Sequence, residues 1–250
     1  MTLFRNVVFI AALAGLVAGI IMTAMQTYAT VPLILQAETF EYAGGGHDHG
    51  ATEAAPADAA APAAAHIHEH DEDAWAPADG FERFFYTALA NIVTAIGFGL
   101  LLVAVSELAG GIANWRQGVF WGFAGFAIFT LAPGLGLPPE LPTMPAADLA
   151  DRQVWWTATV VATAAGLALI AFRSSLVLAL VGVALIVAPH IIGAPQPESH
   201  DSMIPADLHH RFVVAVTVTN LIFWVVLGAG AGLIRARLSG SAGSLRDSFA

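Results

Sequence analysis

Histidine and acidic residues are concentrated in one segment of the chain, and their spacing suits metal binding. Neutral imidazole is a good ligand for Zn, Ni, Cu and Co, and carboxylates can complete the coordination sphere. Alternating histidines in a flexible segment can wrap an ion, and the Ala/Pro-rich stretch 51–65 between the clusters has little to bury. We therefore predict that a disordered loop over residues 36–80 captures a divalent transition metal. Its predicted ligands are His47, His49, His66, His68, His70 and Asp71.

A second set of candidate ligands lies later in the chain. His190 follows Pro189 near the end of an apolar run, where proline bends a helix and frees a backbone carbonyl. An ionisable side chain at that depth in a membrane is a functional candidate, and a satisfied interfacial histidine is an equally good explanation. Two of the later histidines are adjacent in sequence, so they cannot share one helix face. The set comprises Glu140, His190, His200, Asp207, His209 and His210.

The composition excludes several other chemistries. The chain has no cysteine, which removes disulfides, Cys-based zinc sites and thiolate catalysis. It lacks the Gly-x-x-x-x-Gly-Lys-[Ser/Thr] loop of ATP hydrolysis, the His-Glu-x-x-His motif and the Gly-x-Ser-x-Gly elbow. The formal net charge is −10, which does not suit a nucleic-acid partner. We expect neither an enzyme nor a tightly bound cofactor.

The apolar segments that must position these ligands are long enough to cross a lipid bilayer. The chain has 250 residues, 57% of them apolar and 11% charged, whereas soluble domains carry roughly 25% charged residues. A helix needs about 20 apolar residues to cross a hydrocarbon core of about 30 Å. We predict an all-α integral membrane protein with a single membrane domain over residues 1–250. The six predicted transmembrane helices cover 6–28, 84–105, 117–135, 154–172, 175–192 and 212–234.

The positions of the charges predict the orientation. Six of the nine Arg residues, including Arg5, Arg116 and Arg173, would share one side, and the positive-inside rule makes that side cytoplasmic. Both termini are then cytoplasmic. All histidines, and all acidic residues except Glu107 and Asp247, lie at or beyond the outer edge. The first segment is longer than a typical signal-peptide core and lacks a clear Ala-x-Ala site, so we expect it to be retained; cleavage would leave five helices.

Three outer segments end with a similar sequence motif just before the next apolar run. Each contains Pro-Ala-Asp or Pro-Ala-Ala-Asp, and an Arg follows the Asp by four residues. Asp is a favoured N-cap, and Arg one turn later can pair with it. We predict three helical hairpins of the same orientation, although a general preference for these residues at helix starts would give the same motif. The three Asp/Arg pairs are Asp79 and Arg83, Asp148 and Arg152, and Asp207 and Arg211.

The exits of the third and fifth predicted helices carry a family resemblance. The segments LAPGLGLPPELP (131–142), DRQVWW (151–156) and APHIIGAP (188–195) resemble the CbtA family of probable cobalt-transporter subunits. The opening Phe4-Arg5, the glycines at 15 and 19, the His-rich loop and Phe223-Trp224 agree with it. The resemblance implies a bacterial inner-membrane protein of five or six spans that takes part in cobalt uptake for cobalamin supply. It also implies a small His-bearing membrane partner subunit of the CbtB type, and a homo-oligomer is compatible with the sequence.

These observations favour a metal permease component. In this hypothesis the periplasmic loop concentrates Co²⁺, and Ni²⁺ or Zn²⁺ would bind flexible histidines as well. His190, with Glu140 or the histidines and Asp of the last loop, forms an entry site to the helix bundle. The alternative is a non-transporting metal-binding or assembly subunit that delivers metal to a partner channel. The scarcity of charge inside the predicted helices favours that alternative, and export instead of uptake also stays open.

Overall fold

Helices make up all the regular secondary structure in the residues that the computed structural model describes, which are 2–44, 77–78 and 80–247. The predicted all-α fold is confirmed for these residues. Along the chain the helices are α1 (Thr2–Ala29), α2 (Val31–Gly44), α3 (Phe81–Leu108), α4 (Trp115–Phe126), the π-helix η1 (Ala127–Leu131), α5 (Ala132–Gly136), α6 (Leu149–Phe172), α7 (Leu176–Ile192) and α8 (Ala206–Asp247).

Five stretches of the described residues are long and apolar enough to cross a membrane. They agree with five of the six predicted helices. The other predicted transmembrane helix, 175–192, corresponds to α7, which is apolar but has only 17 residues. At 1.5 Å per residue it rises about 26 Å, slightly less than a hydrocarbon core of about 30 Å. The number of crossings is therefore not confirmed. The five stretches are Phe4–Ala29, Phe81–Leu108, Trp115–Gly136, Leu149–Phe172 and Ala206–Leu238.

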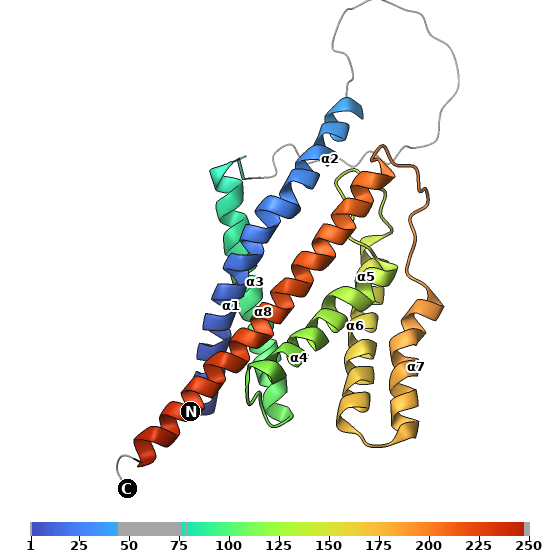
Figure 1. Cartoon of the computed structure of the whole chain (residues 1–250). Helices are drawn as coiled ribbons and strands as arrows, with labels where there is room; N and C mark the ends of the chain where they lie inside the picture. Colours follow the sequence, from blue (N-terminus) through green and yellow to red (C-terminus); the bar gives the residue numbers. More distant parts are fainter. Residues whose placement is uncertain (1, 45–76, 79, 248–250) are drawn as a thin grey trace, which may run out of the picture.

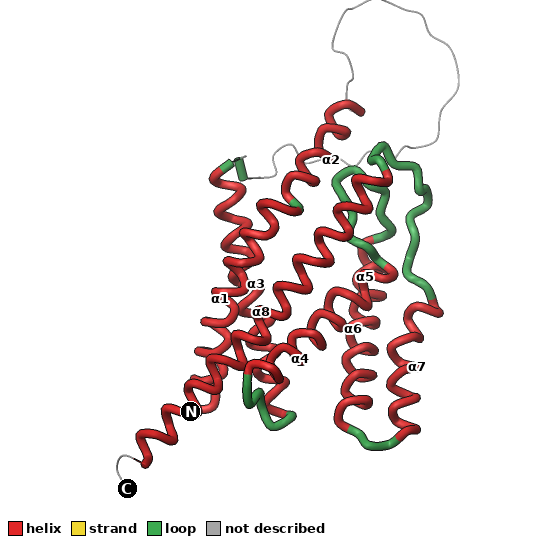
Figure 2. Tube along the Cα trace, viewed as in Figure 1, coloured by secondary structure: helices red, strands yellow, loops and turns green. Residues whose placement is uncertain are grey.

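The helices α1, α3, α4, α6, α7 and α8 run alternately between the two ends of the molecule (Figures 1 and 2). The start of α1 and the end of α8 lie at the same end, which we call the N/C end. The connections 137–148 and 193–205 lie toward the opposite end, which we call the loop end. The helix α2 continues α1 toward the loop end, with a break at Thr30. Pro32 accounts for the break because it has no backbone N–H to continue the helical hydrogen bonds.

The helix α2 occupies the first part of the predicted loop 36–80. We expected a loop from residue 36, but α2 remains helical through Gly44. Its Leu33 and Ala37 are buried against Leu208 and Phe212 of α8, in a small apolar cluster at the loop end. Burial of this face explains why the helix continues beyond the predicted membrane segment.

The helix pairs that pack closely differ from the predicted hairpins. The helix α1 packs on α3, as the first hairpin requires, and it also packs on α8. However, α4 packs mainly on α8, and α6 packs mainly on α7. The three-hairpin arrangement is therefore not confirmed.

Glycines explain these close approaches. A Cβ added at Gly118 of α4 would overlap the carbonyl oxygen of Gly228 of α8, and the reverse is also true. Gly166 of α6 and Gly182 of α7 are related in the same way. Small residues let membrane helices approach until their backbones touch. The main apolar core lies along the α1–α3–α8–α4 contacts, with Trp224 almost fully buried.

Candidate metal site

The first group of predicted ligands lies outside the described residues. It consists of His47, His49, His66, His68, His70 and Asp71, all within 45–76. Metal capture by this segment stays a prediction from the sequence.

Glu140 lies in the connection that follows α5, near the loop end. Its carboxylate forms an ion pair with Arg152 of α6, with Nη2 and Oε2 3.0 Å apart. Both side chains are partly buried, at 25% and 29% exposed. Asp148 caps α6 by accepting hydrogen bonds from the backbone N–H groups of Ala150 and Asp151, as the sequence predicts for an N-cap. Because Arg152 occupies Glu140, this carboxylate would have to exchange partners before it could bind a cation.

His209 lies close to the same connection. Its Nε2 is 3.1 Å from the carbonyl oxygen of Pro139, the residue before Glu140. A carbonyl only accepts hydrogen bonds, so Nε2 must donate and Nδ1 carries the lone pair of the neutral ring. The contact therefore joins α8 to the connection after α5 and leaves Nδ1 as the nitrogen that could bind a metal.

His190 is positioned by α6. The indole N–H of Trp155 donates to the carbonyl oxygen of Pro189 at 3.2 Å, and the His190 ring packs edge-on against Trp155 at 5.9 Å between centroids. Pro189 also accepts from the N–H of Gly193 at the end of α7. The half-buried His190 is thus held by ring packing beside the α6–α7 contact.

The other predicted ligands point to water or lipid. His200, Asp207 and His210 are exposed. In the part of the chain that the structure describes, no three His, Asp or Glu side chains come close enough to hold one ion. The entry site proposed around His190 and Glu140 is therefore not assembled in this conformation, and it stays a prediction.

A cavity inside the bundle, lined by both polar and apolar side chains, is a feature that the sequence alone could not reveal. We call it the polar cavity. It has a volume of about 260 Å³ and lies between α1, α2, α3 and α8, toward the loop end. The amides Gln26 and Asn220 and several threonine hydroxyls line it together with the thioether of Met22 and the guanidinium of Arg83. These residues come from helices that are far apart in the sequence, so only the packing of the helices brings them together. The sequence offered one signal of such a cavity, which is an amide side chain at a similar depth in each of three apolar runs: Gln26, Asn91 and Asn220.

A hydrogen-bond network stiffens one wall of this cavity. The amide Nδ2 of Asn91 in α3 donates to Gln26 Oε1 at 2.7 Å and to Thr23 Oγ1 at 3.1 Å in α1. Asn220 donates to the carbonyl of Val216 in its own helix. No described residue donates a hydrogen bond to its Oδ1, so this oxygen could bind a cation or one of the cation's waters.

A known protein family matches almost the whole chain. Residues 4–236, from the first turn of α1 to the last apolar part of α8, match the family described as Probable cobalt transporter subunit (CbtA). The chain belongs to the CbtA family. No curated protein and no solved structure was found to match it. As a CbtA protein with five long apolar helices, the chain is a multi-pass membrane protein and a probable cobalt transporter subunit, which is not an enzyme class.

Two ion pairs brace the CbtA bundle near its ends. At the loop end Arg83 of α3, which lines the cavity, binds Glu38 of α2 with Nη2 and Oε1 2.7 Å apart. At the N/C end Arg235 of α8 binds both carboxylate oxygens of Glu107 at 2.9 and 3.0 Å and donates to the carbonyl of Ile112 at 2.8 Å. Gly111 has no side chain where this guanidinium lies, and a Cβ there would overlap it. The pairs fix the ends of α3 against α2 and α8.

Proposed function

We propose that this chain is the membrane-embedded subunit of a divalent transition-metal uptake system, with Co²⁺ as the substrate. The chain would lie in the bacterial inner membrane with both termini in the cytoplasm and the His-rich loop in the periplasm. The family match supports cobalt, and the six Arg residues expected at the N/C end support the orientation.

The polar cavity is the observation that carries the proposal. Amide and hydroxyl oxygens can replace part of the water around an ion, as they do in channels. A volume of about 260 Å³ holds several waters at about 30 Å³ each, which suits a partly hydrated cation. Oxygen ligands select weakly among divalent metals. The histidines that collect the ion would favour transition metals over Mg²⁺ and Ca²⁺, but would bind Ni²⁺ and Zn²⁺ as well as Co²⁺.

Arg83 and Glu38 would control entry to this cavity. At 4 Å, a guanidinium repels a divalent ion by about 8 kcal/mol in surroundings of effective dielectric constant 20. Arg83 is 37% exposed, so water screens part of this repulsion, and the ion pair with Glu38 cancels much of the rest. A cation that approaches Glu38 would compete with Arg83 for the carboxylate. We infer that entry requires this pair to separate.

The membrane potential can drive inward movement. Two positive charges that move inward across 100 mV release about 4.6 kcal/mol. The histidine loop would raise the local metal concentration at the outer surface but cannot itself move the ion through the bilayer. A small His-bearing subunit of the CbtB type would then assist capture or complete the path.

A non-transporting role in which the chain delivers metal to a partner channel is the second candidate. Within the described residues, the absence of a three-ligand group and the Glu107–Arg235 pair at the N/C end favour it. The two candidates differ in whether this chain alone supports flux.

Reconstitution tests both. We would measure Co²⁺ and Ni²⁺ flux into liposomes with the purified chain, with and without the partner subunit. Replacing the cavity residue Asn220 with Leu should reduce flux at least tenfold because it removes the oxygen that faces the ion. Thr219→Val alters the cavity wall, and Thr217→Val on the same helix, outside the cavity lining, is its matched control. Flux that requires the partner and is insensitive to Asn220→Leu would reject the permease proposal.

Loop capture has a separate test. A variant that lacks residues 44–73 should have several-fold lower uptake when Co²⁺ is scarce and near-normal uptake when Co²⁺ is saturating. An equal loss at both concentrations would show that the loop is needed for passage or folding instead of capture.

A further inference from the structure

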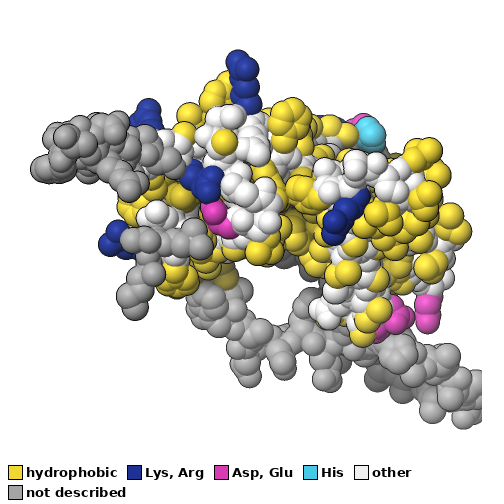
Figure 3. Space-filling view, turned by 90° about the horizontal axis from the view of Figure 1, so that it is seen from below, with side chains coloured by type: hydrophobic (Ala, Val, Ile, Leu, Met, Phe, Trp, Pro, Cys, Tyr) yellow, Lys and Arg dark blue, Asp and Glu magenta, His cyan; other side chains and the backbone are white. Residues whose placement is uncertain are grey.

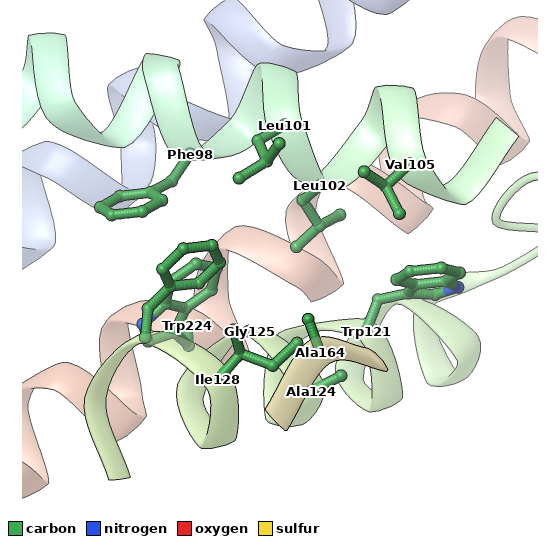
Figure 4. A pocket seen from close by; sticks show the side chains of 11 residues that line it. Phe98, Leu101, Leu102, Val105, Trp121, Ala124, Gly125, Ile128, Ala164 and Trp224 are labelled. Carbon is green, nitrogen blue, oxygen red and sulfur yellow. The ribbon is translucent and has the colours of Figure 1, made fainter. Parts of the chain in front are cut away.

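An apolar cleft at the N/C half of the molecule has no role in the proposed metal path. Two cavities of about 190 and 360 Å³ share Val105, Trp121, Ala124, Ile128 and Ala164, and so form one continuous cleft. Figure 4 shows the smaller of the two cavities, with α3 on one side, α4 on the other and Trp224 of α8 at one end. The cleft continues to Ala109, Gln117 and Phe172 at the N/C end.

The cleft opens to the surrounding membrane. Several residues on its rim have exposed side chains, including Leu101, Val105, Phe120 and Phe172. Its walls are almost entirely apolar, so neither water nor a metal ion is favoured inside it. Its occupant must be an apolar group supplied from the bilayer.

The size of the cleft distinguishes a lipid chain from a protein helix. From Phe98 to Ala109 it follows α3 for about 17 Å, close to the roughly 15 Å depth of one leaflet. A helix segment of that length and about 10 Å diameter occupies roughly 1,300 Å³. The larger cavity holds only about 360 Å³, which is too small to enclose such a segment and suits an extended hydrocarbon chain.

Two Arg residues stand where the headgroup of such a lipid would lie. Arg116 precedes the cleft residue Gln117 in the first turn of α4, and Arg173 follows the cleft residue Phe172 at the end of α6. Both are exposed, and neither forms an ion pair with a described carboxylate. Figure 3, seen from the N/C end, shows Arg side chains among apolar ones on this face. Arg binds phosphate oxygens through paired N–H donors, and the N-terminus of α4 adds partial positive charge.

The geometry points to a binding site for one anionic phospholipid, with an acyl chain in the cleft and the phosphate between Arg116 and Arg173. The site joins α3 and α4 to the α6–α7 pair, where Trp121 and Phe172 are the ring contact across the cleft, 6.4 Å between centroids. A bound chain would therefore fix the position of α6 and α7 against the rest of the bundle. This inference is independent of the transported metal.

Native mass spectrometry of the full chain in mixed phosphatidylglycerol and phosphatidylcholine with identical acyl chains tests the site. We expect about tenfold preferential retention of phosphatidylglycerol, in keeping with charge-assisted hydrogen bonds. The double variant Arg116→Gln/Arg173→Gln should reduce the preference to within about twofold. Arg5→Gln, an exposed Arg at the same end that does not border the cleft, should leave it unchanged. Equal retention of both lipids, or a preference that survives the double variant, would overturn the headgroup assignment.

A second set of variants tests the cleft itself. Ala164→Phe, or Ala168→Leu if the first does not fold, should lower retention of both lipids, whereas Ala158→Phe on an exposed position of α6 outside the cleft should not. Unchanged retention with a filled cleft would overturn the site. So would displacement of the lipid by millimolar inorganic phosphate, because the acyl chain would then contribute nothing. A photo-crosslinking residue at Phe120 should capture lipid, and capture of a polypeptide would contradict the proposed occupant.

Discussion

At the scale of single residues, Arg83 and Glu38 set the charge that a cation meets at the cavity. Arg83 belongs to the cavity wall, while Glu38 lies on α2 and holds the guanidinium. Removing either partner takes away one neighbouring opposite charge from the other. The two single variants should therefore change metal entry in opposite directions.

We predict that Glu38→Gln lowers Co²⁺ uptake about tenfold, because the guanidinium of Arg83 then has one neighbouring counter-charge fewer and repels the ion more strongly. Arg83→Gln should retain or raise the initial rate, since the free carboxylate attracts the cation. Liposome flux measured at subsaturating Co²⁺ distinguishes the two, and Glu82→Gln provides a half-buried acidic control on the same turn of α3. A similar loss in both variants would mean that the pair serves only to hold α2 and α3 together.

His190 can act as a ligand or as a packing partner of Trp155, and its variants separate the two roles. His190→Phe keeps an aromatic ring beside Trp155 but cannot bind metal. If His190 belongs to the entry site, His190→Phe and His190→Ala should reduce Co²⁺ uptake equally, by about tenfold. If the ring only packs, His190→Phe should retain normal flux while His190→Ala lowers the melting temperature. Flux and thermal unfolding measured on the same preparations decide between them.

Residue types and spacing predicted part of the candidate site. Pro189-His190 marked the end of α7, where an ionisable side chain follows a proline, and Asp148 marked the start of α6. The partners could not be predicted, because Trp155 and Arg152 belong to a different helix and reach His190 and Glu140 only through packing. Likewise, nothing in the apolar runs shows that Gln26 and Asn220 face one cavity.

At the scale of helices, local sequence predicted where the helices lie but not which of them pack together. Apolar runs set their positions because backbone groups in lipid must be hydrogen-bonded within the helix. Pro133 further explains the π-helical turn η1 before it, since it offers no N–H to the preceding carbonyl. The pairing of α4 with α8 depends on where Gly118 and Gly228 meet, which no local pattern specifies.

We predict that Gly228→Ala lowers the free energy of unfolding by about 1–3 kcal/mol, because the added methyl group overlaps backbone atoms of α4. Gly97→Ala is the matched control: Gly97 is also within a helix, but a Cβ there meets no atom within 4 Å. Its replacement should be neutral or stabilise by up to about 1 kcal/mol. Thermal unfolding in one detergent measures both. Equal melting temperatures for the two variants would contradict the proposed α4–α8 contact.

At the scale of the whole molecule, the number of membrane crossings depends on α7. Its 17 residues are short for a crossing, but the α6–α7 turn lies at the N/C end and the connection after α7 lies toward the loop end. Close packing of Gly182 against Gly166 of α6 can hold a short helix across the bilayer while the membrane thins locally. Six crossings place both termini on one side, whereas five would separate them.

The absence of cysteine makes this question directly testable, because each introduced thiol is the only one in the chain. Ser174→Cys lies in the α6–α7 turn and Ser199→Cys in the connection after α7, and both positions are exposed. With six crossings, a membrane-impermeant maleimide applied from outside should label Ser199→Cys in intact spheroplasts and Ser174→Cys only after lysis. Ala146→Cys, in the connection before α6, calibrates the outer side, and Ala113→Cys, just before α4, calibrates the inner side. If Ser199→Cys labels together with Ser174→Cys, α7 returns to the side it started from, and the last helix must then carry the C-terminus to the outside.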